Sequence, residues 1–173
     1  PVYNIDVTKL VIALQEQCRK AGITFEILVY DDLSKNKFKD KNKGLAQVMG
    51  VSYVEMKENF GRARIRNKLA RYSNFPNLLF IDSDSKLPNK SYIKNYLPYI
   101  GKYQVIYGGR KYTKRRPTAK KKILHWEYGT KREALPARKR NKNPHLNFMS
   151  NNFIIQRDVF NRVKFDSEHT GYG

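Results

Sequence analysis

The chain has 173 residues and one cysteine, Cys18, so it is long enough for one domain with a sizeable core and contains no internal disulfide. Its net charge is +20, from 35 Lys and Arg against 15 Asp and Glu, which favours an anionic partner: a nucleotide, a nucleic acid or an anionic lipid surface. An apolar content of 40% with 13% aromatic residues excludes a disordered chain, and no apolar run approaches the roughly eighteen residues of a membrane span. We expect a cytoplasmic protein, because residues 1–4 show no signal-peptide pattern and a single cysteine suits a reducing compartment.

Apolar periodicity predicts an alternation of helices and strands. Asp6 is a candidate N-cap for the first helix, and Gly22 can end it. In chain order we expect a helix over 7–18, a strand over 25–30, a Lys/Asn loop over 35–43, a strand over 51–56, a helix over 62–72, a strand over 78–81, a helix over 91–96, a strand over 105–107, a strand over 148–155 and a helix over 157–163. This alternation predicts an α/β fold with a mostly parallel central sheet flanked by helices.

Two of the expected strands end in pairs of carboxylates. Asp31 and Asp32 follow the first strand, and Asp82 and Asp84 follow the strand over 78–81. Because the carboxyl ends of parallel strands meet at one edge of a sheet, we expect these side chains to line a common crevice. Asp82 and Asp84 share one face of an extended chain, and carboxylate oxygens suit a hard divalent ion. The alternative is an Asp-rich turn without a ligand.

The positive charge is concentrated in one segment. Residues 110–142 hold fourteen Lys and Arg but only Glu127 and Glu133, so they carry a net +12 of the +20. A smaller series of alternate lysines runs over 35–43, where a solvated loop is the simpler interpretation. In the basic segment, Trp126 suits either a sugar-stacking or a packing role.

Both ends of the sequence look cut. Residues 1–4 lead into a helix as a loop after a strand does, but no strand precedes them, and Gly173 stops inside what looks like a site loop. We therefore expect a central strand to be missing from the sheet.

The motifs, taken in order, resemble the family 2 glycosyltransferases of GT-A fold, a Rossmann-like α/β architecture. The matching stretches are Pro1-Val2-Tyr3-Asn4, Val29-Tyr30-Asp31-Asp32-Leu33-Ser34, Asn59-Phe60-Gly61, Arg66-Asn67, Phe80-Ile81-Asp82-Ser83-Asp84, Asn151-Asn152-Phe153, and Phe165-Asp166 through Gly171-Tyr172-Gly173. The resemblance implies one GT-A domain over 1–173, with a nucleotide-sugar-binding half over 1–109 and an incomplete acceptor-side half over 110–173.

The resemblance also implies an activity and a donor site. The activity is metal-dependent, inverting transfer of a sugar from a nucleotide diphosphate to an acceptor hydroxyl in polysaccharide or glycoconjugate synthesis. The metal is Mn²⁺ or Mg²⁺, and a UDP-sugar is favoured over a GDP-sugar. Carried over by position, the residues flanking the nucleotide are Pro1, Val2, Tyr3, Asp31, Asp32, Arg66, Asn67 and Asp82, and the metal ligand is Asp84.

The sequence departs from the family at two places. Leu33 stands where the family usually has glycine, so the turn is expected to differ locally. The general base usually follows a Gly-Tyr-Gly or Gly-Trp-Gly stretch, so it is expected beyond Gly173, and we assign it neither to Asp166 nor to Glu168.

The acceptor and the rival functions stay open at this point. The acceptor implied is a glycan or a lipid-linked molecule, and the basic segment suits an anionic acceptor or a peripheral position at the inner membrane surface. Asn151 and Asn152 could contact that acceptor or cap a turn. The alternatives are a basic nucleic-acid-binding domain and a metal-dependent nucleotidyltransferase. We expect no nucleic-acid partner, because no RRM, zinc-finger or helix-turn-helix signature is present and strand-end carboxylates repel phosphate.

Overall fold

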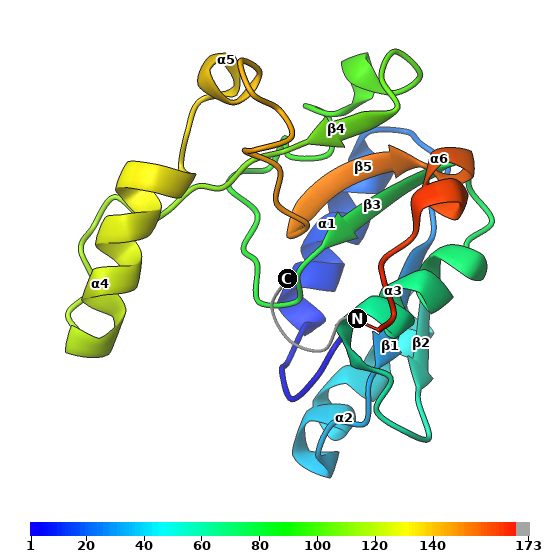
Figure 1. Cartoon of the computed structure of the whole chain (residues 1–173). Helices are drawn as coiled ribbons and strands as arrows, with labels where there is room; N and C mark the ends of the chain where they lie inside the picture. The colour runs from blue at the N-terminus through cyan, green and yellow to red at the C-terminus, as the bar shows by residue number, and fades with distance from the viewer. Residues whose placement is uncertain (169–173) are drawn as a thin grey trace.

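The computed structural model describes residues 1–168, in which helices alternate with short strands (Figure 1). The first half contains α1 (Thr8–Lys20), β1 (Ile27–Asp31), α2 (Asn36–Asn42), the 3₁₀ helix η1 (Lys43–Gln47), β2 (Val51–Glu55), α3 (Gly61–Arg71) and β3 (Asn77–Ile81). The second half contains the 3₁₀ helix η2 (Leu97–Tyr99), β4 (Val105–Tyr107), α4 (Lys120–Tyr128), the π-helical turn η3 (Gly129–Glu133), α5 (Ala137–Arg140), β5 (Asn152–Gln156) and α6 (Arg157–Val163). The α/β fold predicted from the sequence is confirmed, and the parallel pairing expected for its central sheet is seen between β1 and β2.

The strands form two sheets. β1 and β2 pair in parallel, with Val29 opposite Tyr53. β5 lies between β3 and β4 and runs antiparallel to both, with Phe153 opposite Phe80 on one side and Tyr107 on the other. β3 and β4 therefore run in the same direction, and their carboxyl ends lie at the same edge.

An apolar cavity of about 620 Å³ lies between the two sheets, lined by residues of α1, β1, α3 and β3. At its end, Val2 forms a parallel bridge with Asp31: the Val2 amide donates to the Tyr30 carbonyl at 2.8 Å, and the Asp32 amide donates to the Val2 carbonyl at 2.8 Å. These two bonds hold the first residues of the chain at the carboxyl end of β1.

Buried aliphatic and aromatic side chains hold the elements around the sheets. α1 packs Val11 against β1 and turns Leu14 and Cys18 toward the segment over 92–96. On the other face of the second sheet, Phe80 stacks on Phe153 with ring centroids 5.0 Å apart. Each such buried side chain contributes roughly 1.5–3 kcal/mol relative to exposure. No helix within residues 1–168 is long and apolar enough to cross a bilayer.

Three expected elements are placed differently. The lysine-rich segment forms α2 and η1 rather than a loop, because Asn42 is fully buried and bonds to the loop before α1: it accepts from the Val7 amide at 3.0 Å and donates to the Ile5 carbonyl at 2.8 Å. The expected helix over 91–96 is a series of turns, and the strand expected over 148–155 begins only at Asn152.

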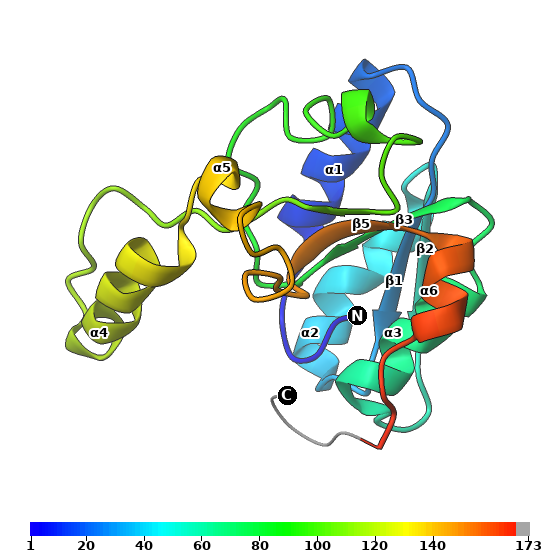
Figure 2. The same cartoon turned by 45° about the horizontal axis from the view of Figure 1, so that its top comes forward.

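The basic segment forms an arm, residues 110–142, that extends from β4 (Figures 1 and 2). Its outermost part, α4, stands apart from the two sheets in both views. The arm is held together internally: Glu133 accepts from Arg110 at 2.7 Å and from the Tyr112 hydroxyl, and Trp126 Nε1 donates to the Thr113 carbonyl at 2.8 Å. The indole N–H of Trp126 thus ties α4 to the chain before it.

Candidate active site at the carboxyl ends of β1 and β3

Asp31 is the last residue of β1 and is fully buried. Its Oδ1 accepts from the Ser34 amide at 2.7 Å, and its Oδ2 accepts from the Tyr53 hydroxyl at 3.4 Å. Burial, with the charge of Asp31 as the next cause, raises the pKa of Tyr53. Both oxygens of Asp31 therefore have partners inside the protein, and this carboxylate fixes the turn after β1.

Asp32 stabilises the beginning of α3. Its two carboxylate oxygens accept from the amides of Phe60 at 2.7 Å and Gly61 at 3.0 Å, and its carbonyl accepts from Asn59 Nδ2 at 2.9 Å. A carboxylate at a helix N-terminus binds unpaired amides and complements the helix dipole. Gly61 has φ +73°, a conformation that a side chain would strain. The Asn59-Phe60-Gly61 motif thus shapes this part of the site.

In the turn between Asp31 and Ser34, Leu33 has a left-handed backbone conformation, which is usually adopted by glycine. Leu33 has φ +68° and a 45% exposed side chain. Leu33 is therefore a strained residue in this turn. Ser34 Oγ accepts from the Asn4 amide at 2.8 Å, and Asn4 Oδ1 accepts from the Lys35 amide at 2.9 Å, which ties the turn to the first residues of the chain.

Arg66 joins α3 to the end of β3. It forms a short ion pair with Asp82 and donates to Ser150 Oγ at 3.4 Å. Its guanidinium also lies over the Phe165 ring, 5.3 Å from the centroid. The next residue, Asn67, donates to the Phe165 carbonyl at 2.8 Å and accepts from the Phe165 amide at 2.9 Å. Arg66 therefore orients Asp82, and Asn67 holds the chain that follows α6.

The Pro1 amine lies where these groups converge. In a chain that begins at Pro1, burial and then the charge of Arg66 lower the pKa of this amine to about 6, against the opposing effect of the carboxylates of Asp82 and Asp32. The backbone bonds of Val2 to Tyr30 and Asp32 place Pro1 at the carboxyl end of β1, and the Arg66–Asp82 ion pair lies within electrostatic range of it, as the sequence motifs imply. Next to them, Val2 is buried and Tyr3 is 58% exposed.

Asp84 differs from the other three aspartates. It is exposed and has neither a hydrogen bond nor an ion pair with any residue from 1 to 168. Asp82, two positions earlier, uses Oδ1 for Arg66 and accepts from the Ser85 amide through its carbonyl at 3.0 Å. Within the described chain no three His, Cys, Asp or Glu side chains gather around a metal position. A metal bound by Asp84 would therefore take most of its ligands from phosphate oxygens and water.

The two asparagines after the arm have separate roles. Asn152 Oδ1 accepts from the hydroxyls of Tyr92 at 2.5 Å and Tyr96 at 2.6 Å, so it serves packing. The Asn151 carbonyl accepts from the Asp82 amide at 3.0 Å, and the buried Oδ1 of Asn151 has no partner among residues 1–168. Sequence reasoning did not single out Ser150 or Tyr53, because each contacts the site through long-range folding alone.

The terminal loop lies partly outside the described residues. Gly171, Tyr172 and Gly173 of the family-like motif fall there, as does the expected position of the general base. Within the described part, Asp166 Oδ1 accepts from the Glu168 amide at 2.9 Å, which is a local turn.

The structure is that of an α/β protein whose charged side chains Asp32, Arg66 and Asp82 gather at the carboxyl ends of β1 and β3, the usual position of a nucleotide site. Residues 1–164 match the sequence profile of "Glycosyl transferase family 2". The chain belongs to this family, and its fold is of the GT-A type. No match is found among curated proteins.

Solved structures of similar fold include S. aureus TarS 1-349, with a TM-score of 0.64 and 19% identity over 99% of this chain and 50% of that one. The same protein in complex with UDP gives a TM-score of 0.65 at 19% identity, over 97% of this chain and 49% of that one. Mannosyltransferase PcManGT from Pyrobaculum calidifontis, in complex with GDP-Man and Mn²⁺, gives 0.56 at 16% identity, over 97% of this chain and 46% of that one. The chain thus spans about half the length of these proteins.

Proposed function

We propose that the protein transfers a sugar from a nucleotide-diphosphate donor to an acceptor hydroxyl. The observation that carries the proposal is the convergence of Pro1, Asp32, Arg66 and Asp82 at the strand ends, two positions before the exposed carboxylate of Asp84, which has no partner within residues 1–168. Family membership supports it, and TarS has been solved with UDP-GlcNAc. A nucleic-acid-binding domain and a nucleotidyltransferase lose their basis, because neither accounts for a family match over residues 1–164.

In this proposal the donor nucleotide lies along the first residues and the ends of β1 and β3. Pro1, Val2 and Tyr3 flank the base, and Arg66 with Asn67 shapes the pocket from α3. The aspartates have different roles in this proposal. Asp31 and Asp32, held by bonds within the protein, form the rigid wall on the base and ribose side. Asp82, held by Arg66, faces the ribose. A pocket whose polar groups are already fixed loses little entropy on binding.

Asp84 is the proposed ligand of Mn²⁺ or Mg²⁺. Its carboxylate is exposed and unpaired within residues 1–168, and one or two carboxylates with diphosphate oxygens and water make a usual site for such ions. The bound ion would supply charge neutralisation of the leaving diphosphate. The protein fixes the chain next to this ligand. Arg66 holds the side chain of Asp82, and the Asn151 carbonyl holds its amide, so the position of Asp84 two residues later is restricted and the diphosphate would be held in one place.

Inverting transfer requires a base that removes the proton from the acceptor hydroxyl. We place that base beyond Gly173 and the acceptor on the side of residues 110–173, with the donor on the side of residues 1–109. The acceptor is a glycan or a lipid-linked molecule.

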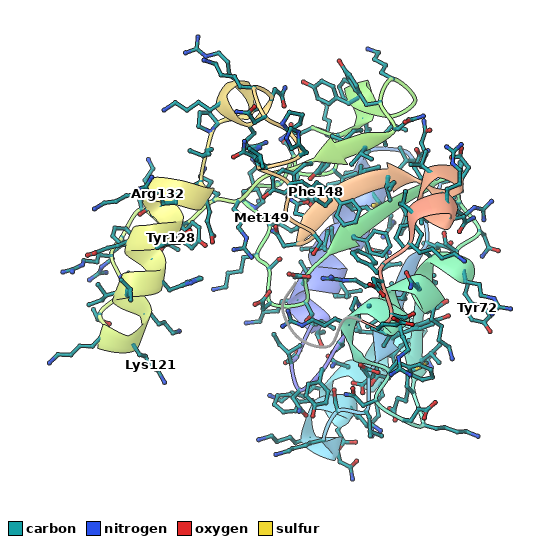
Figure 3. All side chains as sticks on the ribbon, in the orientation of Figure 1. Tyr72, Lys121, Tyr128, Arg132, Phe148 and Met149 are labelled. Atoms are coloured by element: carbon teal, nitrogen blue, oxygen red, sulfur yellow. The ribbon has the colours of Figure 1, made fainter. Side chains whose placement is uncertain are left out.

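The arm supports a second contact, with an anionic membrane surface. Lys121, Leu124 and Tyr128 stand at i, i+3 and i+7 of α4 and so share one face of the helix, which Figure 3 shows with Lys121 and Tyr128 labelled; Tyr128 is 59% exposed and Leu124 78% exposed. Apolar and basic side chains on one helical face suit an anionic bilayer surface. This contact would place the protein peripherally on the cytoplasmic side of a membrane.

Thermal unfolding with nucleotide sugars tests the donor proposal. A ligand that binds the native state raises its stability by mass action, so a UDP-sugar with Mn²⁺ should raise the Tm more than either component alone. GDP-sugars serve as the comparison. Equal Tm values with and without every nucleotide sugar, in the presence of Mn²⁺, would contradict the proposal.

A further inference from the structure

A second pocket lies away from the donor site, between β4 and the chain that joins α5 to β5. Its volume is about 300 Å³, and its walls include Tyr107, Arg140, Asn141, His145 and Phe148. In Figure 3 the label of Phe148 marks where this connecting chain meets the sheet. The proposed donor site uses none of these residues.

Two aromatic rings form the inner wall of the pocket. Tyr107 and Phe148 lie with centroids 5.6 Å apart and an interplanar angle of 59°, and Phe148 packs edge-on against Phe153 in the core at 5.1 Å. Phe148 nevertheless stays 40% exposed. A partly exposed ring anchored in the core, with a few polar groups nearby, is the usual composition of a site for a small polar molecule with an apolar face, such as a sugar ring.

The pocket is positively charged. The Arg140 guanidinium lies over the Tyr107 ring, 5.1 Å from the centroid, and donates to the Tyr107 carbonyl at 3.4 Å and to the Leu135 carbonyl. Residues 134–157 contain no Asp or Glu, whereas Arg138, Lys139 and Lys142 surround Arg140 in sequence. A fixed guanidinium without a carboxylate partner favours an anionic group on the ligand.

The register of the sheet places this pocket on the same edge as the candidate active site. Tyr107 pairs with Phe153, which pairs with Phe80, so Tyr107 is level with the residue two positions before Asp82. Two strand spacings separate them, which is about 10 Å. β3 and β4 point the same way, so the pocket and the carboxylate of Asp82 lie toward the same edge of the sheet.

We propose that this pocket binds an anionic sugar residue of the acceptor, one that carries a phosphate or a carboxylate and is set back from the hydroxyl that receives the new sugar. The inference rests on the proposed glycosyl transfer and names the class of acceptor. It assigns the ring to Tyr107 and Phe148, and the charge to Arg140 and its basic neighbours.

The test is a direct binding measurement by saturation-transfer NMR on the whole chain, with four probes: glucose 6-phosphate, glucuronic acid, methyl glucoside and inorganic phosphate. We expect at least one of the charged sugars to bind at least tenfold more tightly than both methyl glucoside and inorganic phosphate. Comparison of the two charged sugars distinguishes a phosphate from a carboxylate. Equal affinity for glucose 6-phosphate and inorganic phosphate, with no binding of glucuronic acid, would overturn the proposal, because it shows a basic surface that attracts anions alone.

Two variants locate the binding. Phe148→Ala removes the aromatic wall, and Asn141→Asp places a negative charge at an exposed pocket residue; each should weaken charged-sugar binding at least tenfold. The matched controls are Leu146→Ala, 76% exposed in the same loop, and Asn143→Asp, which adds the same charge outside the pocket. Because Phe148 also contacts the core, Asn141→Asp decides the result if Phe148→Ala unfolds. Similar weakening by Asn141→Asp and Asn143→Asp would place the site elsewhere.

UDP binding separates this proposal from the donor proposal. All four variants should bind UDP like the parent, because the donor site lies at β1 and β3. If Phe148→Ala or Asn141→Asp loses charged-sugar binding but binds UDP like the parent, the pocket proposal is supported separately from the donor site. If the parent itself does not bind UDP, the donor proposal is contradicted, and the sugar measurement still tests the pocket.

Discussion

Arg66 and Asp82 form an ion pair that joins α3 to the end of β3, and the Arg66 side chain is 11% exposed against 33% for Asp82. Through α3 the pair also links the carboxyl ends of β1 and β3, because Asp32, directly after β1, binds the amides at the beginning of α3. A change in Arg66 is therefore transmitted to the position of Asp82 and of the residues after it.

Replacing Arg66 with alanine should weaken nucleotide binding and destabilise the fold. The change leaves the Asp82 carboxylate without its partner and removes the contact with Phe165, so we expect a loss of about 1–3 kcal/mol in the free energy of unfolding and at least tenfold in UDP affinity. Urea unfolding and calorimetric titration measure the two quantities. Arg64→Ala, at an exposed position of the same helix, is the control and should change neither.

Asp84→Ala should remove the metal-dependent part of nucleotide binding and leave the fold intact. Asp84 is exposed and has no partner among residues 1–168, so its loss should change the free energy of unfolding by less than about 0.5 kcal/mol. Calorimetric titration of UDP with and without Mn²⁺ gives the metal-dependent part. Glu16→Ala removes an exposed carboxylate from α1 and should bind like the parent. If Asp84→Ala retains the full Mn²⁺ effect, another group holds the ion.

Leu33→Gly should stabilise the protein. Leu33 has φ +68°, a left-handed conformation that costs a residue with a side chain roughly 1–2 kcal/mol, and its exposed side chain gives little back. After the entropy of glycine in the unfolded chain is subtracted, we expect a gain of about 1 kcal/mol. Chemical denaturation measures it. Leu33→Ala keeps the strained backbone, so a similar gain in that variant would assign the effect to the side chain instead.

Removing charge from the arm should weaken binding to anionic liposomes. Lys120, Lys121 and Lys122 are exposed at the beginning of α4, and each basic residue near an anionic surface contributes about 1 kcal/mol, so a triple alanine variant should bind on the order of 100-fold more weakly. Liposome co-sedimentation at rising salt measures the affinity. A variant with alanine at Lys20, Lys57 and Lys102 loses the same charge elsewhere. If the two triple variants lose the same affinity, or if the parent binds neutral and anionic liposomes equally, the arm does not make the membrane contact.

The parts of the fold predicted from sequence are those with a local signal. Apolar runs such as 78–81 predict buried strands, and the carboxylates after them predict the edge at which the site lies. Asp31, Asp32, Asp82 and Asp84 were all singled out in this way. The family motifs added Pro1 and Arg66, which the structure brings beside Asp32 and Asp82.

The parts that escaped prediction depend on contacts between distant residues. Asn42 is fully buried because it bonds to the loop before α1, thirty-five and thirty-seven positions away, and nothing near it in sequence indicates this. In the turns over 91–96, Tyr92 and Tyr96 both bond to Asn152 in β5, sixty and fifty-six positions away, a contact that no local pattern indicates. In the site, sequence places four aspartates together but cannot separate Asp32, which caps a helix, from Asp84, which has no partner within residues 1–168.

The Pro1 amine offers a prediction about pH. In a chain that begins at Pro1, burial and then the charge of Arg66 lower the pKa of this amine from 8.0 to about 6. The unfolded chain therefore binds more protons than the folded chain between pH 6 and 8, and the free energy of unfolding should rise with pH across this window. Below pH 6 both states are protonated, and above pH 8 neither is, so the contribution is constant outside the window.

Nucleotide binding should also change with pH near 6, the pKa of the amine in the folded chain, because protonated Pro1 adds a positive charge near Arg66 and Asp82. Carbon-13 chemical shifts of labelled Pro1 report the titration directly, with a midpoint expected near pH 6. Arg66→Ala removes a positive neighbour and should move the midpoint upward, whereas Arg64→Ala should leave it in place. A midpoint near 8 in the folded parent would show that the amine is solvated, and the convergence of Pro1 with Asp32, Arg66 and Asp82 would then be wrong.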